Sequence, residues 1–138
     1  PGNVRALGHV RTAEHNAFYG SPRAALSVNR ESMARCGWSP ATRIFEAAAA
    51  GACTLTDAWP GIEDFFEPGR EILVAQDGEQ VVRQLEGLDA ARARRIRERA
   101  RARALAEHTY EQRARQVQDV LDGAVDLPAP STVARTGS

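Results

Sequence analysis

Hydrophobic residues follow two alternating patterns along the chain. Short apolar runs, typical of strands, are found at residues 4–10, 24–29, 53–57 and 71–75. Apolar residues at helical spacing predict helices over residues 12–20, 40–50, 78–88, 89–108 and 110–121. The segment 31–38 is expected to be a loop or a helical turn, and a short turn is expected at 62–66. Strands that alternate with helices predict an α/β fold with a parallel sheet flanked by helices.

Several helix ends carry recognisable signals. Ser39 is a suitable N-cap, and Pro40 suits a first turn because its missing N–H would have no partner there. Gly51 fits the left-handed position at which many helices end. Thr12 and Asp89 are predicted to cap the helices that follow them.

Arg43 and Glu46 are the most informative charged residues. They are three positions apart, so a helix over 40–50 places them on one face, where a surface ion pair would contribute about a few tenths of a kcal/mol. A binding role is the alternative. The free N–H groups of a first helical turn attract an anion, and a carboxylate further along can accept hydrogen bonds from a sugar diol. Arg43 could then meet a phosphate or orient Glu46.

The predicted sheet also indicates where a ligand would bind. Open parallel sheets bind ligands beyond the carboxyl ends of their strands, often at helix N-termini. In this chain that region comprises the loops at 29–39 and 57–63. Trp38 lies in the first loop and could stack on a base or a sugar ring, or pack against the protein, whereas Trp59 is interpreted as a loop anchor.

Composition indicates one modest domain. The chain has 138 residues, of which 43% are hydrophobic and 26% charged. We expect the domain to span residues 1–123, because residues 124–138 are rich in Pro, Ser, Thr and Gly, without periodicity, and are predicted to be a disordered tail. All 18 basic residues are Arg, a bias typical of high-GC bacterial genomes, and 18 acidic residues balance them.

This balance argues against binding to nucleic acid or anionic membranes through net charge. Seven Arg residues lie between positions 92 and 103, but on a helix they spread around most of the circumference and no aromatic residue interleaves with them. We therefore expect a solvated helix, or one that touches an acidic partner. A nucleic-acid interface is a weaker alternative, whose affinity would fall steeply with salt.

Other chemistry and the cellular setting are less specific. Cys36 and Cys53 are far apart and are interpreted as reduced structural thiols, and no metal site is predicted from the three His residues. No apolar run could span a membrane and no signal peptide is recognisable, so we expect a cytoplasmic protein. The chain lacks an initial Met and opens on a turn, which suggests a piece of a longer protein.

The segment SPATRIFEAAAAGACTLTDAWPGIEDFFEPGREILVA (residues 39–75) resembles the donor-binding half of GT-B glycosyltransferases. The likeness is to the group 1 and the CgeB-like, spore-maturation type families. NVRALGHVRTAEHNAFYGSPRAALSVNR (3–30) and RARALAEHTYEQRARQV (101–117) fit the same families, so the resemblance covers residues 3–121. It implies that the sheet is Rossmann-like and belongs to the C-terminal domain of a GT-B fold.

The resemblance also implies roles for particular residues. Glu46 would hold the ribose of a nucleotide diphosphate sugar, with no cofactor or metal, and departing diphosphate would be stabilised by helix N–H groups and Arg. The other predicted donor-site residues are Ser39, Ala41, Thr42, Arg43, Glu63 and Arg30. Many group 1 enzymes carry a second Glu eight residues before the first, near the donor sugar. Here that position is Trp38, and Arg30 or Glu31 could substitute.

A GT-B enzyme needs a second Rossmann-like domain that binds the acceptor and usually supplies the base. We expect this N-terminal domain to be missing from the chain, which alone would be inactive, and its catalytic residues stay unassigned. A non-catalytic ligand-binding or partner-docking module of the same fold is the alternative. An uncovered sheet edge could also pair with a second copy to form a homodimer.

Overall fold

The computed structural model describes residues 2–125. The chain divides after Glu107 into two compact units. The first unit contains a three-stranded sheet and its helices, and the second contains α6 (Tyr110–Leu121). The predicted boundary at residue 123 remains a prediction, and residues 126–138 of the expected tail lie outside the described residues.

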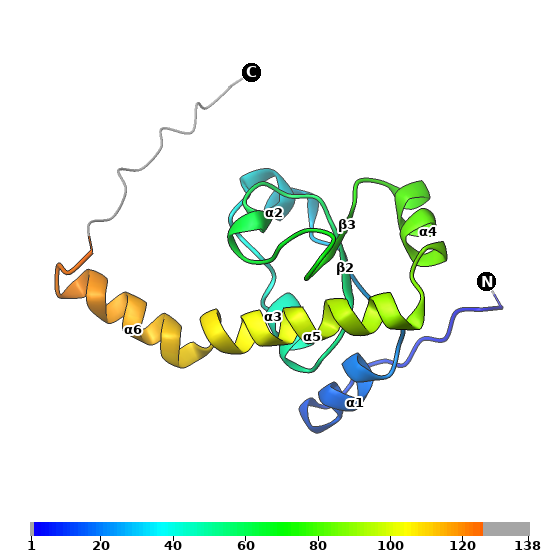
Figure 1. Ribbon diagram of the computed structural model, residues 1–138, viewed down its shortest axis with the longest axis horizontal. Helices are drawn as coiled ribbons and strands as arrows, with labels where there is room; N and C mark the ends of the chain where they lie inside the picture. The colour runs from blue at the N-terminus through cyan, green and yellow to red at the C-terminus, as the bar shows by residue number, and fades with distance from the viewer. Residues whose placement is uncertain (1, 126–138) are drawn as a thin grey trace, which may run out of the picture. The chain divides into compact units, whose positions relative to one another are not determined.

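The first unit is an α/β arrangement, as predicted (Figure 1). Its strands are β1 (Ala25–Ser27), β2 (Thr54–Asp57) and β3 (Leu73–Ala75), in the order β1-β2-β3 and all parallel. Its helices are η1 (Thr12–Glu14), α1 (His15–Gly20), α2 (Glu31–Cys36), α3 (Thr42–Ala49), η2 (Ile62–Asp64), α4 (Gly78–Glu86) and α5 (Ala90–Glu107). The sheet is therefore Rossmann-like, with helices between and after its strands.

Two strand predictions are wrong. Residues 4–11 form no strand, and the apolar side chains of Val4 and Leu7 remain exposed, because no neighbouring strand pairs with this segment. The run at 24–29 does form β1, but β1 is an edge strand rather than a buried one. Leu26 is 61% exposed although it stands in register with the buried Leu55. Alternation alone could not reveal how far the cover of helices extends over the sheet.

Two predicted helix caps are also wrong. The N-cap of α3 is Ala41 rather than Ser39, and neither Ala41 nor Arg11, the N-cap of η1, makes a side-chain capping bond. The chain stays extended at Ala41, with ψ of 132°, so Pro40 precedes the helix instead of starting it. Asp89 does act as predicted, since its carboxylate accepts a hydrogen bond from the backbone N–H of Arg92 at 2.6 Å.

The core has one apolar cluster on each face of the sheet. Successive residues of the β3 segment alternate between them: Ile72 belongs to the first cluster and Leu73 to the second. The first cluster includes Ile44 and Ala48 of α3 with Trp59, which confirms Trp59 as a loop anchor. The second includes Leu55 and the side chains of Leu88, Ala93 and Ile96. Helix α5 thus contributes to both faces.

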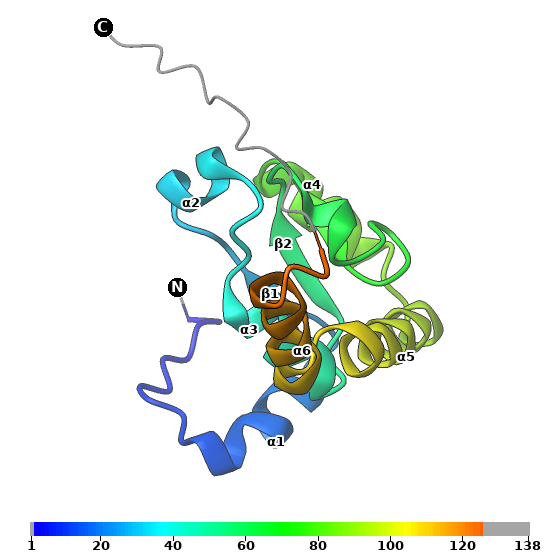
Figure 2. The same ribbon diagram turned by 90° about the vertical axis from the view of Figure 1, so that its left-hand side faces the viewer.

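Small side chains join α3 to α5. The two helices lie against each other (Figures 1 and 2), and Ile44 and Ala48 of α3 share a buried cluster with Ala100 and Ala104 of α5. Alanine lets two helix backbones approach closely, so the alanine-rich sequence of α3 has a packing reason. Gly51 ends this segment with a φ of 78°, as predicted. Its backbone conformation, and not a close contact, favours glycine here, since an added Cβ would meet no atom within 4 Å.

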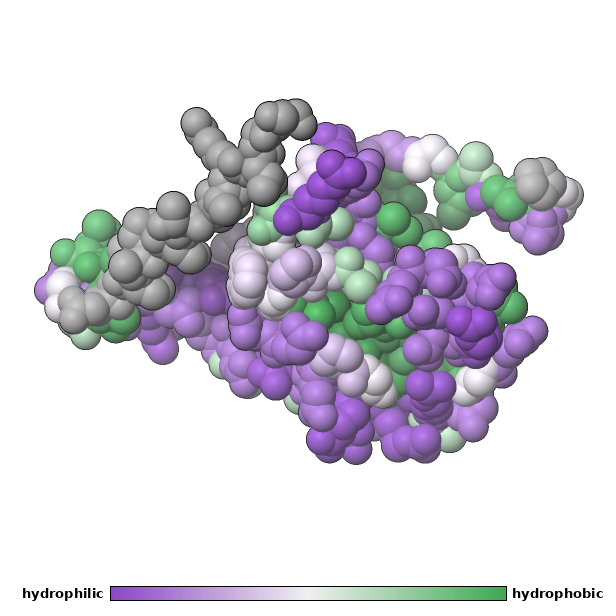
Figure 3. Space-filling view, turned by 90° about the horizontal axis from the view of Figure 1, so that it is seen from above, coloured by the Kyte–Doolittle hydropathy of each residue, from purple (hydrophilic) through white to green (hydrophobic). Residues whose placement is uncertain are grey.

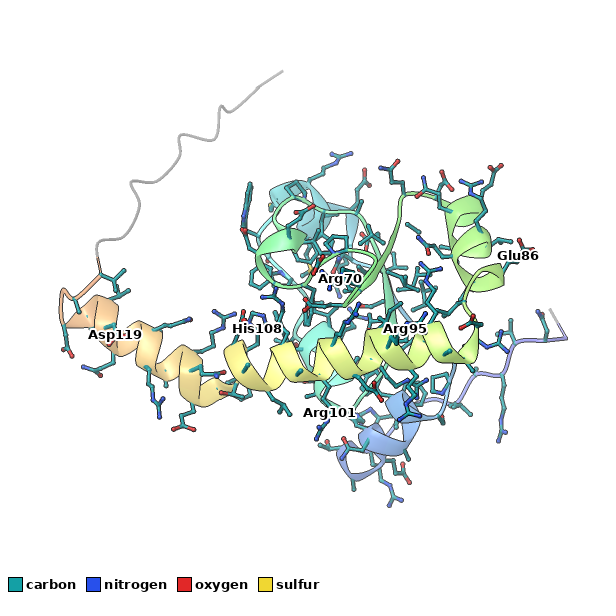
Figure 4. All side chains as sticks on the ribbon, viewed as in Figure 1. Arg70, Glu86, Arg95, Arg101, His108 and Asp119 are labelled. Atoms are coloured by element: carbon teal, nitrogen blue, oxygen red, sulfur yellow. The ribbon has the colours of Figure 1, made fainter. Side chains whose placement is uncertain are left out.

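The arginines of α5 are scattered around the helix, as the spacing predicts. Arg95 and Arg101 leave α5 in different directions (Figure 4). Arg94 pairs with Glu98 at 2.8 Å, and Arg103 bonds Glu71 at 2.5 Å. The hydrogen bond to Glu71 is the main reason that the pKa of Arg103 is raised above its ordinary value. The half-buried Arg103 therefore ties α5 to the segment that leads into β3.

The second unit is an amphipathic helix with a well-formed start. Thr109 and Gln112 form a capping box, in which the Gln112 side chain accepts from the Thr109 N–H at 2.7 Å. The predicted apolar stripe of α6 is exposed at Tyr110, Val117 and Leu121. No helix within residues 2–125 is long and apolar enough to cross a membrane.

Overpacking the contact between α3 and α5 should destabilise the fold. Ala100→Leu adds a large side chain at a position that is 2% exposed, and we expect it to lower the free energy of unfolding by about 1–3 kcal/mol. Urea unfolding followed by circular dichroism measures this change. Ala102→Leu, at an exposed position of the same helix, is the control and should change stability little. If Ala100→Leu and Ala102→Leu lowered the free energy of unfolding equally, the close packing of α5 against α3 would be contradicted.

The two cysteines should differ in reactivity. Burial raises the pKa of the Cys53 thiol, outweighing the opposite effects of Arg97 and Arg92, whereas Cys36 is exposed. In the folded protein, a maleimide should therefore label Cys36 quickly and Cys53 only when the protein unfolds. Mass spectrometry of the labelled peptides, with and without urea, tests this expectation. Rapid native labelling of Cys53 would show that the second cluster is open.

Candidate functional site

The carboxyl ends of the three strands define one edge of the sheet. In Figure 1, α2 and the loops after β2 and β3 lie at the top of the sheet, beyond these ends. Figure 3 looks down on the molecule from that side and shows hydrophobic side chains between groups of hydrophilic ones. Helix α3 leads from the loop after α2 to the start of β2. Parallel sheets bind ligands beyond the carboxyl ends of their strands.

Asp57, at the end of β2, joins two loops at this edge. Its Oδ1 accepts hydrogen bonds from the backbone N–H of Asn29 at 2.9 Å, from Asn29 Nδ2 at 3.0 Å and from Thr56 Oγ1 at 3.2 Å. Asn29 immediately precedes Arg30, the N-cap of α2. One carboxylate therefore fixes where the chain leaves β1 relative to the end of β2, and with it the start of α2.

Two polar atoms at this edge have spare hydrogen-bonding capacity. Ser27 is buried at the end of β1, and its Oγ has no hydrogen-bond partner among the described residues. Asn29 Oδ1 is likewise buried without a described partner. Buried polar groups are normally paired, so each unpaired one calls for an explanation. Both atoms are closed off from solvent in this conformation.

The N-terminus of α3 offers free backbone donors. No side chain caps it, and its first intrahelical bond runs from the Ile44 N–H to the Ala41 oxygen at 3.1 Å. The N–H groups of Thr42 and Arg43 precede that bond and point along the helix dipole, where negative charge is favoured. An anion such as a phosphate fits this position.

Arg43 and Glu46 are both exposed, on the face of α3 opposite its buried residues Ile44, Ala47 and Ala48. The surface ion pair that their spacing allows is not formed. Within the described residues neither side chain makes a hydrogen bond or an ion pair. Both charged groups are thus available to a ligand, one beside the free N–H groups and the other about one turn further along.

The loop after β2 is held against α3 by aromatic side chains. The ring of Phe45 lies 5.8 Å from that of Phe65 and 5.6 Å from that of Phe66, measured between centroids. Trp59 lies 5.9 Å from Phe65. These contacts position η2, which carries the predicted site residue Glu63, near the start of α3. Glu63 itself is exposed.

The seven predicted site residues lie at the start of α2, in the loop before α3, on α3 and on η2. Arg30 is exposed at the start of α2, Ser39 is exposed and Ala41 half-buried before α3, and Thr42 is exposed at its first position. No side-chain hydrogen bond or ion pair joins any two of the seven. Their participation in a site stays a prediction.

The sequence did not reveal two hydrogen bonds that fix the loops at this edge. Asn29–Asp57 was not foreseen, although each residue is the last of a predicted strand, which is a usable signal. The bond from Trp38 Nε1 to Asp64 Oδ2, at 2.8 Å, joins residues 26 positions apart and leaves no pattern in the sequence. Among residues 2–125, no three His, Cys, Asp or Glu side chains gather as a metal-binding group.

Comparison with known families agrees with this geometry. Residues 1–119 match the model of the glycosyl transferase-like family, which covers most of the chain. The chain therefore belongs to the glycosyl transferase-like family, a family of transferases, and its general chemistry is glycosyl transfer. No curated protein matched the sequence.

Removing the Asp57 carboxylate should destabilise the sheet edge. Asp57→Ala leaves two donors of the half-buried Asn29 without an acceptor, and we expect a loss of about 1–3 kcal/mol in the free energy of unfolding. Denaturant titration measures the loss. Asp119→Ala is the control, since the Asp119 carboxylate makes no hydrogen bond or ion pair within the described chain. If Asp57→Ala and Asp119→Ala had the same free energy of unfolding, the hydrogen bonds between Asp57 and Asn29 would add no stability.

Proposed function

We propose that this domain binds a nucleotide diphosphate sugar at the carboxyl edge of its sheet, as the donor half of a GT-B glycosyltransferase. The observation that carries the proposal is the uncapped start of α3, with Arg43 and Glu46 exposed and unpaired on one face among the described residues. The diphosphate would meet the N–H groups of Thr42 and Arg43, and the Glu46 carboxylate would accept hydrogen bonds from the ribose hydroxyls.

This arrangement suits the bond change in glycosyl transfer. When the bond between the sugar carbon and the diphosphate oxygen breaks, negative charge grows on that oxygen. Free N–H groups at the start of a fixed helix, together with a guanidinium, stabilise such charge without having to reorganise. Because Ala48 packs against Ala100 and Ala104, these groups are held in place before the donor arrives.

The acceptor and the base that takes its proton would lie on a second Rossmann-like domain. Under this proposal, the 138-residue chain alone binds the donor but transfers no sugar. Membership of the CgeB-like branch rests on the order of motifs from the RIFEAAAAG helix to the HTYEQR segment. The competing function is a non-catalytic module of the same fold, in which the α3 face contacts some other ligand or partner.

Substitution of Glu46 should separate these two functions. We expect Glu46→Ala to weaken binding of the preferred nucleotide diphosphate by about tenfold to a hundredfold, because hydrogen bonds to a charged group contribute about 1.5–3 kcal/mol. Calorimetric titration with UDP, GDP, ADP and dTDP measures the affinities. Glu86→Ala is the matched control, an exposed carboxylate of α4 far from α3 in sequence, and should bind like the wild type.

If the unfolding midpoints of Glu46→Ala and Glu86→Ala are unchanged, any loss of nucleotide affinity is a local effect of the substitution. If Glu46→Ala bound the nucleotide with unchanged affinity, the proposed contact between the Glu46 carboxylate and the ribose would be contradicted. Absence of binding by all four nucleotides to the wild-type chain would favour the non-catalytic module. Detectable sugar transfer by the chain alone would contradict the need for a second domain.

A further inference from the structure

Positive charge is concentrated on one helix of the first unit, α5. It carries seven of the 18 arginines and two of the 18 acidic residues, Glu98 and Glu107, which is a formal charge of +5. The rest of the chain therefore has 11 arginines and 16 acidic residues, a formal charge of −5. The neutral total thus conceals a strongly basic helix in an otherwise acidic chain.

Three arginines of α5 are half-buried and help to hold the helix in place. Arg92 Nη1 donates a hydrogen bond to the Gly87 oxygen at 3.2 Å, and Arg103 Nε donates to Glu71 at 2.5 Å. Arg97 is likewise half-buried. These three side chains lie beside the buried face of α5, so their role in packing accounts for them.

The other four arginines of α5 are exposed, and packing does not account for them. Arg94 pairs with Glu98 at 2.8 Å, whereas Arg95, Arg99 and Arg101 make no hydrogen bond or ion pair within the described chain. Arg95 and Arg99 are four positions apart, and like charges at this spacing destabilise a helix. A surface that serves solubility alone intersperses both signs of charge. The outer side of α5 instead keeps uncompensated positive charge.

These free arginines lie on both flanks of an apolar strip. Arg95 and Arg101 leave α5 in different directions (Figure 4). At about 100° per residue, Ala91, Ala102 and Leu105 lie between them on the helix surface, and all three are exposed. One small anion does not reach both flanks, whereas an extended anionic surface does. The small side chains of the strip let the helix approach such a surface closely.

An anionic lipid surface matches this arrangement. Lipids diffuse laterally, so their phosphates collect around arginines on both flanks, while the strip of Ala and Leu meets the headgroup layer. Clusters of about four to eight basic residues on a helix are typical of sites for anionic lipids. Single-stranded nucleic acid is a poorer match, because α5 contains no aromatic residue on which bases would stack. We infer that α5 is a peripheral membrane-binding surface that attaches this domain to anionic lipids.

Co-sedimentation of the 138-residue chain with lipid vesicles tests this inference. The probes are vesicles of phosphatidylcholine with about one-third phosphatidylglycerol, and neutral vesicles of phosphatidylcholine alone. We expect binding to the anionic vesicles only, with an affinity that falls as salt is added. The combined variant Arg95→Gln, Arg99→Gln and Arg101→Gln should weaken that binding about a hundredfold, at about fivefold per arginine. Gln and Arg have similar helix propensities, so α5 should still form.

The matched control removes three exposed arginines outside α5 and changes the net charge equally: Arg5→Gln, Arg83→Gln and Arg115→Gln. It should bind the anionic vesicles nearly as well as the wild type. If both combined variants lost the same affinity, net charge rather than α5 would cause the binding, and the inference would be overturned. Wild-type protein that binds neither kind of vesicle, binds both equally, or binds a DNA duplex more tightly than the anionic vesicles would also overturn it. The measurement uses no nucleotide, so its outcome is independent of the proposed donor site.

Discussion

The contact between α3 and α5 determines where the predicted site residues of α3 lie. Ala48 on α3 and Ala100 and Ala104 on α5 bring the two helix backbones close together, and Ile44 anchors the same cluster beside Trp59. Helix α3 is short, so its position depends on this packing more than on its own stability. Because that position is fixed, the free N–H groups at the start of α3 are fixed as well.

Hydrogen bonds then fix the loops that follow β1 and β2. Asp57 holds the chain as it leaves β1, and Asp64 and the Pro60 oxygen hold Trp38. The same edge keeps Ser27 Oγ and Asn29 Oδ1 without described partners. The loop after β2 thus supplies acceptors that fix this edge of the sheet.

The site was predictable where it depends on local signals. The spacing of Arg43 and Glu46 placed them on one helix face, and the alternation of strands and helices gave the parallel sheet. The prediction of Ser39 as N-cap failed, because Trp38 is held by a loop more than twenty residues later and the chain stays extended through Ala41. A capping preference of about 1 kcal/mol is easily outweighed by such contacts.

By itself, the sequence determined the α/β class, the capping of α5 by Asp89, and the order of motifs that resembles glycosyltransferases. Only the tertiary structure decided that residues 4–11 form no strand, that β1 is an edge strand and that Trp38 is exposed. The physical reason is that periodicity reports which face of an element is apolar. Whether that face is covered depends on residues far along the chain, and no local pattern encodes them.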